Sequence, residues 1–164
     1  MDRAFGLPGT LAGYAVSGYW LGLTAGRFLI SPLAARTGLT TASMMYACLA
    51  GITVAAMLVW LAPSAVLATA ALVLLGFFLA PVFPTTMAIA PRFTHARLVP
   101  SAIGVMNAGS VAGGAALPWL AGVIAQATGI WTLLPFSVTL ALLQFAVWRP
   151  LAARVREPVR NLVT

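Results

Sequence analysis

Residues that could carry out acid–base or nucleophilic chemistry are scarce in this chain. Its 164 residues include two carboxylates, Asp2 and Glu157, one histidine, His95, and one cysteine, Cys48. Hydrolysis, group transfer and metal binding need such side chains in sets that converge on one place, and these four are scattered along the sequence. A lone cysteine forms neither a disulfide nor a zinc site within the chain. We therefore expect a protein that is not an enzyme and that holds no metal and no cofactor.

Uncharged polar and aromatic side chains are the remaining candidates, and they could bind a neutral solute. Ser17, Trp20 and Thr24 lie at helical spacing in an apolar segment and share one face. If the hydroxyls merely donate to their own backbone, that face has no binding role. Asn107 and Ser110 share a face of a later segment, where an amide needs a hydrogen-bond partner. A neighbouring helix and a water-filled cavity would supply one equally well.

Phe83 and Thr85 form a third candidate group, beside two prolines. Pro81 and Pro84 each lack an N–H, so the carbonyl four residues earlier loses its helical partner and is free to face a cavity. The same prolines could instead serve only to bend the helix. In either case the sequence predicts a bend at this place.

These candidates lie in apolar segments, two of which, 37–91 and 98–148, contain no charge at all. A bilayer core of about 30 Å is crossed by roughly 20 apolar residues, so each stretch holds two helices. Turn residues at 62–64 and 126–129 separate them. With 62% hydrophobic and 7% charged residues, the chain cannot build a water-facing surface, which indicates an all-α membrane protein. The expected transmembrane helices are 10–31, 41–62, 66–90, 101–125 and 130–149.

Glycines recur at every fourth position in the first expected helix. Gly18, Gly22 and Gly26 form one stripe, on the face opposite Ser17 and Trp20. Such a stripe allows the backbone of a neighbouring helix to approach to van der Waals contact. The pattern predicts close helix packing along this face.

The arginines indicate how the chain is oriented. If the five helices alternate in direction, eight of the nine basic residues fall on one side of the membrane and only Arg3 on the other. The positive-inside rule then places the N-terminus outside and the C-terminus in the cytoplasm. The net charge of +7 does not indicate a nucleic-acid partner, because the arginines lie in separate loops without interleaved aromatic residues. The lipid bilayer is the expected partner.

Three runs of residues resemble a known family. The run 18–38, GYWLGLTAGRFLISPLAARTG, is similar to the second helix and following loop of a major facilitator superfamily repeat. That family's loop has the form Gly-x-Leu-Ala-Asp-Arg-x-Gly-Arg. The positions that agree with it are Leu33, Ala34, Arg36 and Gly38, and those that depart are Ser31, Ala35 and Leu39. The runs 76–86 and 107–122 look like the tenth and eleventh helices of fucose-permease-like sugar transporters.

The resemblance implies a secondary active transporter with twelve helices. This chain would supply helices 8 to 12, as part of a six-helix C-terminal bundle, with the bundle in residues 1–150 and a cytoplasmic basic tail in 151–164. Its partners would be the lipid bilayer, a small-molecule solute and the missing N-terminal half. The expected location is the inner (plasma) membrane of a bacterium, as a multi-pass protein.

By the same resemblance, the chain is expected to take part in proton-coupled transport of a sugar or another small neutral solute by alternating access. The substrate-facing residues would be Ser17, Trp20, Thr24, Phe83, Thr85, Asn107 and Ser110. A conformational loop would include Arg27, Arg36 and Gly38. The alternatives are an exporter of drugs or metabolites from the same superfamily, and a non-transporting membrane subunit or scaffold that packs through its glycine faces.

Overall fold

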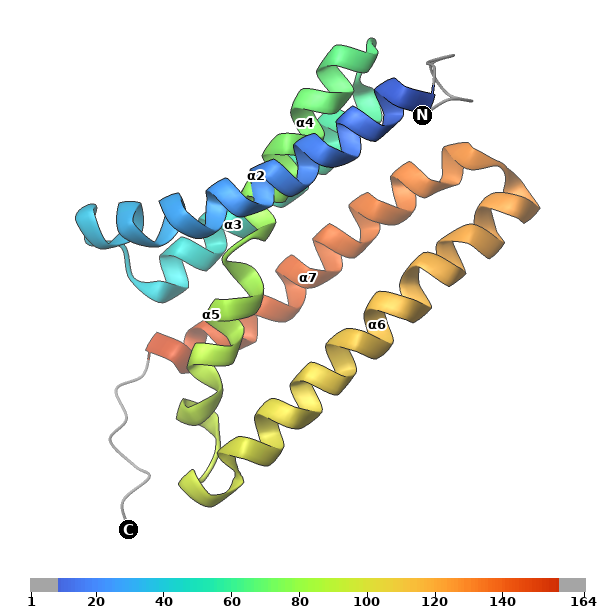
Figure 1. Ribbon diagram of the computed structural model, residues 1–164. Coiled ribbons are helices and arrows are strands. Elements are labelled where there is room, and N and C mark those ends of the chain that lie inside the picture. The colour runs from blue at the N-terminus through green and yellow to red at the C-terminus, as the bar shows by residue number, and fades with distance from the viewer. Residues whose placement is uncertain (1–8, 157–164) are drawn as a thin grey trace.

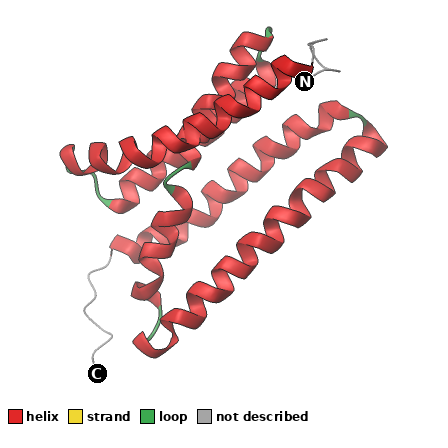
Figure 2. Cartoon of the chain, viewed as in Figure 1, coloured by secondary structure: helices red, strands yellow, loops and turns green. Residues whose placement is uncertain are grey.

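The computed structural model describes residues 9–156, and this part of the chain consists of helices joined by short turns (Figures 1 and 2). The α-helices are α2 (Gly9–Arg36), α3 (Thr41–Leu61), α4 (Ala65–Leu79), α5 (Val82–Ile89), α6 (Val99–Thr128) and α7 (Leu133–Arg156). Short 3₁₀ turns, η1 (Ala90–Phe93), η2 (Ala96–Leu98) and η3 (Ile130–Thr132), connect the later helices. Counting α4 and α5 as one bent helix, the five predicted helices are present.

The turns between helices follow from a few local residues. Gly38 has φ +68°, a conformation that favours glycine, and it ends α2 in a Schellman motif. In that motif the Leu39 N–H donates to the Ala34 carbonyl at 3.0 Å. Thr40 and Ser64 cap the starts of α3 and α4 through their hydroxyl oxygens. Helix boundaries near 40 and 64 are therefore set by the sequence itself.

The predicted bend lies between α4 and α5. Pro81 has no N–H to donate to the carbonyl of Phe77, and α4 ends at Leu79. Pro84 does not add a second break, because it falls in the first turn of α5, where the N–H has no helical partner anyway. The bend is confirmed, and it lies at Pro81.

Four helical stretches among the described residues have the length and composition to cross a membrane. They are Thr41–Leu61, Ala65–Phe93, Ala96–Thr128 and Leu133–Val155. The predicted first span, 10–31, forms a helix as part of α2 but is not among the four. Its glycines, tyrosines and hydroxyl side chains make it less apolar than the others.

The helix ends that differ most from the prediction are those of α2 and α7, and both helices extend farther than predicted. α2 continues past 31 to Arg36, so Arg27 lies inside the helix, about 13 Å from its end, and not in the connecting loop. α7 continues through Pro150 to Arg156, because buried Trp148 and Ala152 hold this last part against α3. The first six residues of the predicted tail are thus helical, and 157–164 lie outside the described residues.

Close backbone contact joins α2 to α4, as the glycine stripe predicts. A Cβ atom on Gly22 would collide with the carbonyl oxygen of Val73, and one on Gly26 with the carbonyl oxygen of Phe77. In return, a Cβ on Gly76 of α4 would collide with the carbonyl oxygen of Tyr19. These contacts allow Cα–H···O interactions between the two helices, as small residues do in membrane proteins.

The hydrophobic core lies between α3, α5 and α7. α4 packs on one side of α3 and α7 on the other, so the helices follow one another in the order α2, α4, α3, α7. Met45 and Leu49 of α3 are each 2% exposed, and Trp148 of α7 packs edge-on against Tyr46. Through Ile89, this cluster also packs α5 against α3 and α7.

By contrast, α6 has no buried residue along its whole length. It contacts the rest of the described chain mainly near its ends, through η1, η2 and η3, and runs beside α7 on the outside of the molecule (Figure 1). One face of α6 therefore remains open for a solute, a lipid or another helix.

Candidate solute-binding groove

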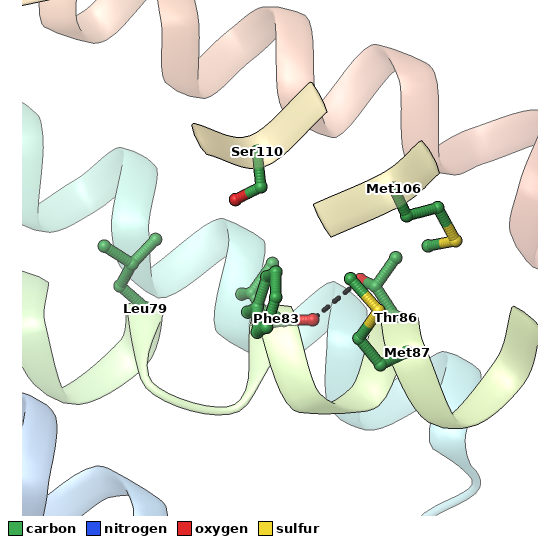
Figure 3. A pocket seen from close by; sticks show the side chains of 7 residues that line it. Leu79, Phe83, Thr86, Met87, Met106 and Ser110 are labelled. Atoms are coloured by element: carbon green, nitrogen blue, oxygen red, sulfur yellow. Dashed lines mark hydrogen bonds between the residues drawn. The ribbon is translucent and has the colours of Figure 1, made fainter. Parts of the chain in front are cut away.

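A groove of about 440 Å³ lies between the α4–α5 bend and the middle of α6 (Figure 3). Its walls are formed by Leu79, Val82, Phe83, Thr86 and Met87 on one side and by Met106 and Ser110 on the other. The break at Pro81 positions the first wall, because it turns α5 away from the direction of α4 (Figure 1). The lining is mostly apolar.

Two hydroxyl groups are the polar part of the groove. The Thr86 hydroxyl donates to the carbonyl of Val82 at 2.7 Å, so its hydrogen is used within its own helix. Ser110 is exposed and makes no hydrogen bond with any described residue. Figure 3 shows its hydroxyl pointing from α6 toward α5. Ser110 is therefore the group in the groove whose donor is free for a solute.

The apolar wall consists of polarisable and aromatic side chains. Phe83 is 45% exposed, and Met87 and Met106 face the groove from opposite sides (Figure 3). Methionine is unbranched and flexible, so it adapts its shape to different partners. Such a wall contacts a solute over a broad area without fixing its orientation, which leaves orientation to the hydroxyl groups.

Two of the predicted substrate-facing residues, Phe83 and Ser110, are brought together here. Thr85 is half-buried on α5, and Asn107 is exposed on α6; neither lines the groove. Asn107 makes no hydrogen bond with any residue of the described chain. Its amide therefore has no partner in the described chain. Both sources predicted for one, a neighbouring helix and a water-filled cavity, stay open.

The remaining three predicted residues lie on α2, away from this groove. The hydroxyl of Ser17 donates to the Gly13 carbonyl at 3.1 Å, and that of Thr24 to the Trp20 carbonyl at 2.9 Å. These are the hydrogen bonds to the helix's own backbone that the alternative interpretation expects. Trp20 is 60% exposed and stacks edge-on against Tyr19. A role for this strip in solute binding stays a prediction.

Sequence reasoning did not select Thr86, Met87 and Met106, which line the groove. Helical spacing could have found them, because Thr86 and Met87 lie three and four residues after Phe83. Likewise, Met106 lies four residues before Ser110. Asn107 was predicted together with Ser110, but it lies three residues before Ser110 and sits farther around the helix than Met106.

The predicted conformational loop is divided between a helix and a turn. Arg36 is in the last turn of α2 and Gly38 is in the turn that follows, where it closes the Schellman motif. Arg27 lies within α2 and is exposed. No carboxylate is present in residues 9–156, so these arginines have no acidic partner in the described part of the chain.

Comparison with known proteins gives one match along nearly the whole chain. A family model described as Major Facilitator Superfamily matches residues 1–163. "Bypass of stop codon protein 6" from Saccharomyces cerevisiae (strain ATCC 204508 / S288c) is 46% identical over 55 residues. These residues make up 34% of this chain and 11% of the yeast protein, so the similarity spans a small part of that relative. No solved structure matches the chain significantly.

Proposed function

Because the chain belongs to the Major Facilitator Superfamily, a family of multi-pass membrane transporters, we propose that it forms the solute-contacting C-terminal part of a secondary transporter. In this proposal its five helices correspond to helices 8 to 12 of a twelve-helix carrier. The small share of the yeast relative that aligns with the chain is compatible with such a part. The missing N-terminal half would supply the opposite wall of the transport path.

The observation that carries the proposal is the groove between α5 and α6. Phe83 and Ser110 meet there inside two stretches long and apolar enough to cross a membrane, Ala65–Phe93 and Ala96–Thr128. A free hydroxyl beside an aromatic ring at that depth suits a neutral solute, because an ion would lose its hydration without gaining a counter-charge. Alternating access would then expose the groove to one side at a time.

The proposed solute is a sugar or another small neutral molecule, with proton coupling supplied elsewhere. Ion coupling inside a membrane usually relies on acidic groups or histidine. Residues 9–156 hold no carboxylate, and their one histidine, His95, lies in the connection between two candidate spans. An acid in the N-terminal half would therefore carry the coupling proton. An exporter of drugs or metabolites is the second candidate, and the apolar wall of Phe83, Met87 and Met106 favours it.

We further propose that α2 crosses the membrane despite its lower hydropathy. It lies in backbone contact along α4, which belongs to a candidate span, so the two helices share the same depth. The α2–α3 turn, the α5–α6 connection and the C-terminal end of α7 all lie toward the left of Figure 1, as alternating spans require. Arg36, Arg92 and Arg97 belong to this end, which the positive-inside rule assigns to the cytoplasm.

Solute binding to the reconstituted chain tests the proposal. We expect proteoliposomes that carry the wild-type chain to bind a labelled neutral sugar or polyol without taking it up, since half of the transport path is missing. Ser110→Ala should weaken binding about 2- to 12-fold, which corresponds to one hydrogen bond. Ser137→Ala is the matched control, because its hydroxyl donates to the Leu133 carbonyl on α7, outside the groove.

Three outcomes would contradict parts of the proposal. Uptake by this chain alone would show that it needs no second half. Unchanged binding in Ser110→Ala, together with a loss in Ser137→Ala, would remove the groove as the solute site. Binding of a hydrophobic dye in preference to every sugar and polyol would favour the exporter.

A further inference from the structure

The α5–α6 connection, residues 90–98, exposes basic and apolar side chains next to one another. It consists of the two 3₁₀ turns η1 and η2. Arg92 and Arg97 are exposed, and so are the large apolar side chains of Phe93, at 43%, and Leu98, at 55%. Large apolar side chains are exposed along the spans as well, and in this connection each of the two directly follows an exposed arginine. Such neighbouring side chains suit a partner that is apolar on one side and anionic on the other.

The position of this connection in the chain indicates its depth in the bilayer. It joins two stretches that are long and apolar enough to span a membrane, one ending at Phe93 and the next starting at Ala96. Its side chains therefore lie where the hydrocarbon core meets the headgroups. Aromatic residues gather at this level because one edge of the ring contacts acyl chains while the other faces the polar layer.

The charges of the connection have no counter-charge in the described protein. Residues 9–156 contain no aspartate or glutamate, so Arg92 and Arg97 form no ion pair there. A guanidinium group offers several N–H donors in a planar fork, which matches the oxygens of a phosphate group. At headgroup depth, lipid phosphates are anions that both arginines can reach.

We propose that the α5–α6 connection is a binding surface for anionic phospholipids. Arg92 and Arg97 bind headgroup phosphates, while Phe93 and Leu98 insert at the boundary of the acyl chains. An acidic soluble protein would satisfy the two arginines but would leave Phe93 and Leu98 without an apolar contact. Because α5 leads into this connection and carries one wall of the groove, a lipid bound here also anchors the end of that helix.

Lipid retention by the full 164-residue chain tests this surface. The protein is incubated in mixed micelles that contain equal amounts of phosphatidylglycerol and phosphatidylcholine, and the lipids that remain after washing are quantified. We expect the wild type to retain phosphatidylglycerol preferentially, and the preference to fall with rising salt. Arg92→Gln and Arg97→Gln should each reduce the preference about fivefold, as an attraction of about 1 kcal/mol per basic residue predicts.

Two control variants distinguish lipid binding at this connection from a general attraction caused by the net charge of the chain. The double variant R92K/R97K keeps both charges and should keep most of the preference. Arg3→Gln removes one charge at a position outside the described residues, which the sequence predicts to lie on the opposite side of the membrane, and should leave the preference unchanged. Phe93→Ala should lower retention by a similar factor at every salt concentration, because its contribution is apolar.

The proposal fails under any of three results. One is an unchanged preference in R92Q and R97Q, and another is an equal loss in R3Q, which would indicate only non-specific attraction. The third is displacement of phosphatidylglycerol by soluble glycerol phosphate at equal concentration, because that would indicate a simple phosphate site. Circular dichroism of each variant confirms that the helices are retained, so that a loss of lipid reports on the surface.

Discussion

The α2–α4 contact and α6 are both rich in glycine, yet their glycines lie in opposite environments. On α2, added Cβ atoms at Gly22 and Gly26 would collide with backbone carbonyl oxygens of α4. On α6, a Cβ would meet nothing within 4 Å at any of five positions. These are Gly104, Gly109, Gly113, Gly114 and Gly122. The same residue type permits a close helix pair in one region and an unoccupied surface in the other.

The difference teaches that a small-residue stripe permits close approach but does not itself supply a partner. α4 contributes its own Gly76 to the contact with the α2 stripe, and the two helices pack backbone to backbone. α6 finds no such helix among the described residues, although Asn107 and Ser110 lie on it unpaired. The scaffold alternative is thus weakened for α2, whose glycine face is already occupied, and stays relevant for α6.

The largest contrast is expected when an apolar side chain is truncated in each region. Leu49 is 2% exposed in the core, so Leu49→Ala removes packing contacts and leaves a cavity. We expect it to lower the free energy of unfolding by about 2 kcal/mol or more. Leu117 on α6 is 41% exposed, and Leu117→Ala should cost less than about 0.5 kcal/mol. Unfolding in mixed micelles with increasing dodecyl sulfate, followed by helicity, measures both values.

Equal losses in these two variants would break the comparison. A large loss in Leu117→Ala would mean that α6 packs against another helix in the micelle, for example that of a second copy. Repeating the measurement over a range of protein concentrations distinguishes such an oligomer from a rearranged monomer.

Replacing glycine by alanine should change stability in opposite directions on α2 and on α6. Gly22→Ala places a methyl group against the Val73 carbonyl, which cannot rotate away, and should destabilise the chain by about 1–3 kcal/mol. Gly113→Ala meets open space, so its higher helix propensity should make it neutral or stabilising by up to about 1 kcal/mol. The same unfolding titration gives both values. Destabilisation by Gly113→Ala of the size expected for Gly22→Ala would show that the α6 stripe is also occupied.

Local signals in the sequence predicted much of the fold. The starts of α3 and α4, the bend at Pro81 and the Gly22 stripe each depend on residues that act on their own neighbours. The end of α7 was not predicted, because Pro150 locally favours a stop while the burial of Trp148 and Ala152 continues the helix. Tertiary packing outweighed local propensity there.

The groove was only partly predictable for a related reason. Phe83 and Ser110 were identified as an aromatic ring and a hydroxyl on suitable faces, but the relative rotation of α5 and α6 decides which neighbours join them. That rotation brings Met106 into the groove and leaves Asn107 outside it. A single sequence defines the faces of each helix but not the way two helices turn toward each other.

Thiol labelling, which is expected to leave stability unchanged, distinguishes a water-filled groove from a lipid-facing helix. Cys48 is buried at 2% exposure and is the only cysteine, so the wild type should resist a charged, water-soluble methanethiosulfonate reagent. Such reagents modify a thiol only where water allows the thiolate to form. We expect Ser110→Cys to be labelled, because this side chain lines the groove between α5 and α6.

Val111→Cys provides the control on the same helix, since position 111 is 67% exposed but does not line the groove. One residue along a helix turns the side chain by about 100°, so this thiol faces lipid if the proposal is right and should stay unlabelled. Labelling of both positions would show that water reaches both faces of α6, as expected if several copies of the chain surround an aqueous space. Labelling of neither would mean that acyl chains fill the groove, and Ser110 would then lose its role as the hydroxyl that contacts a solute.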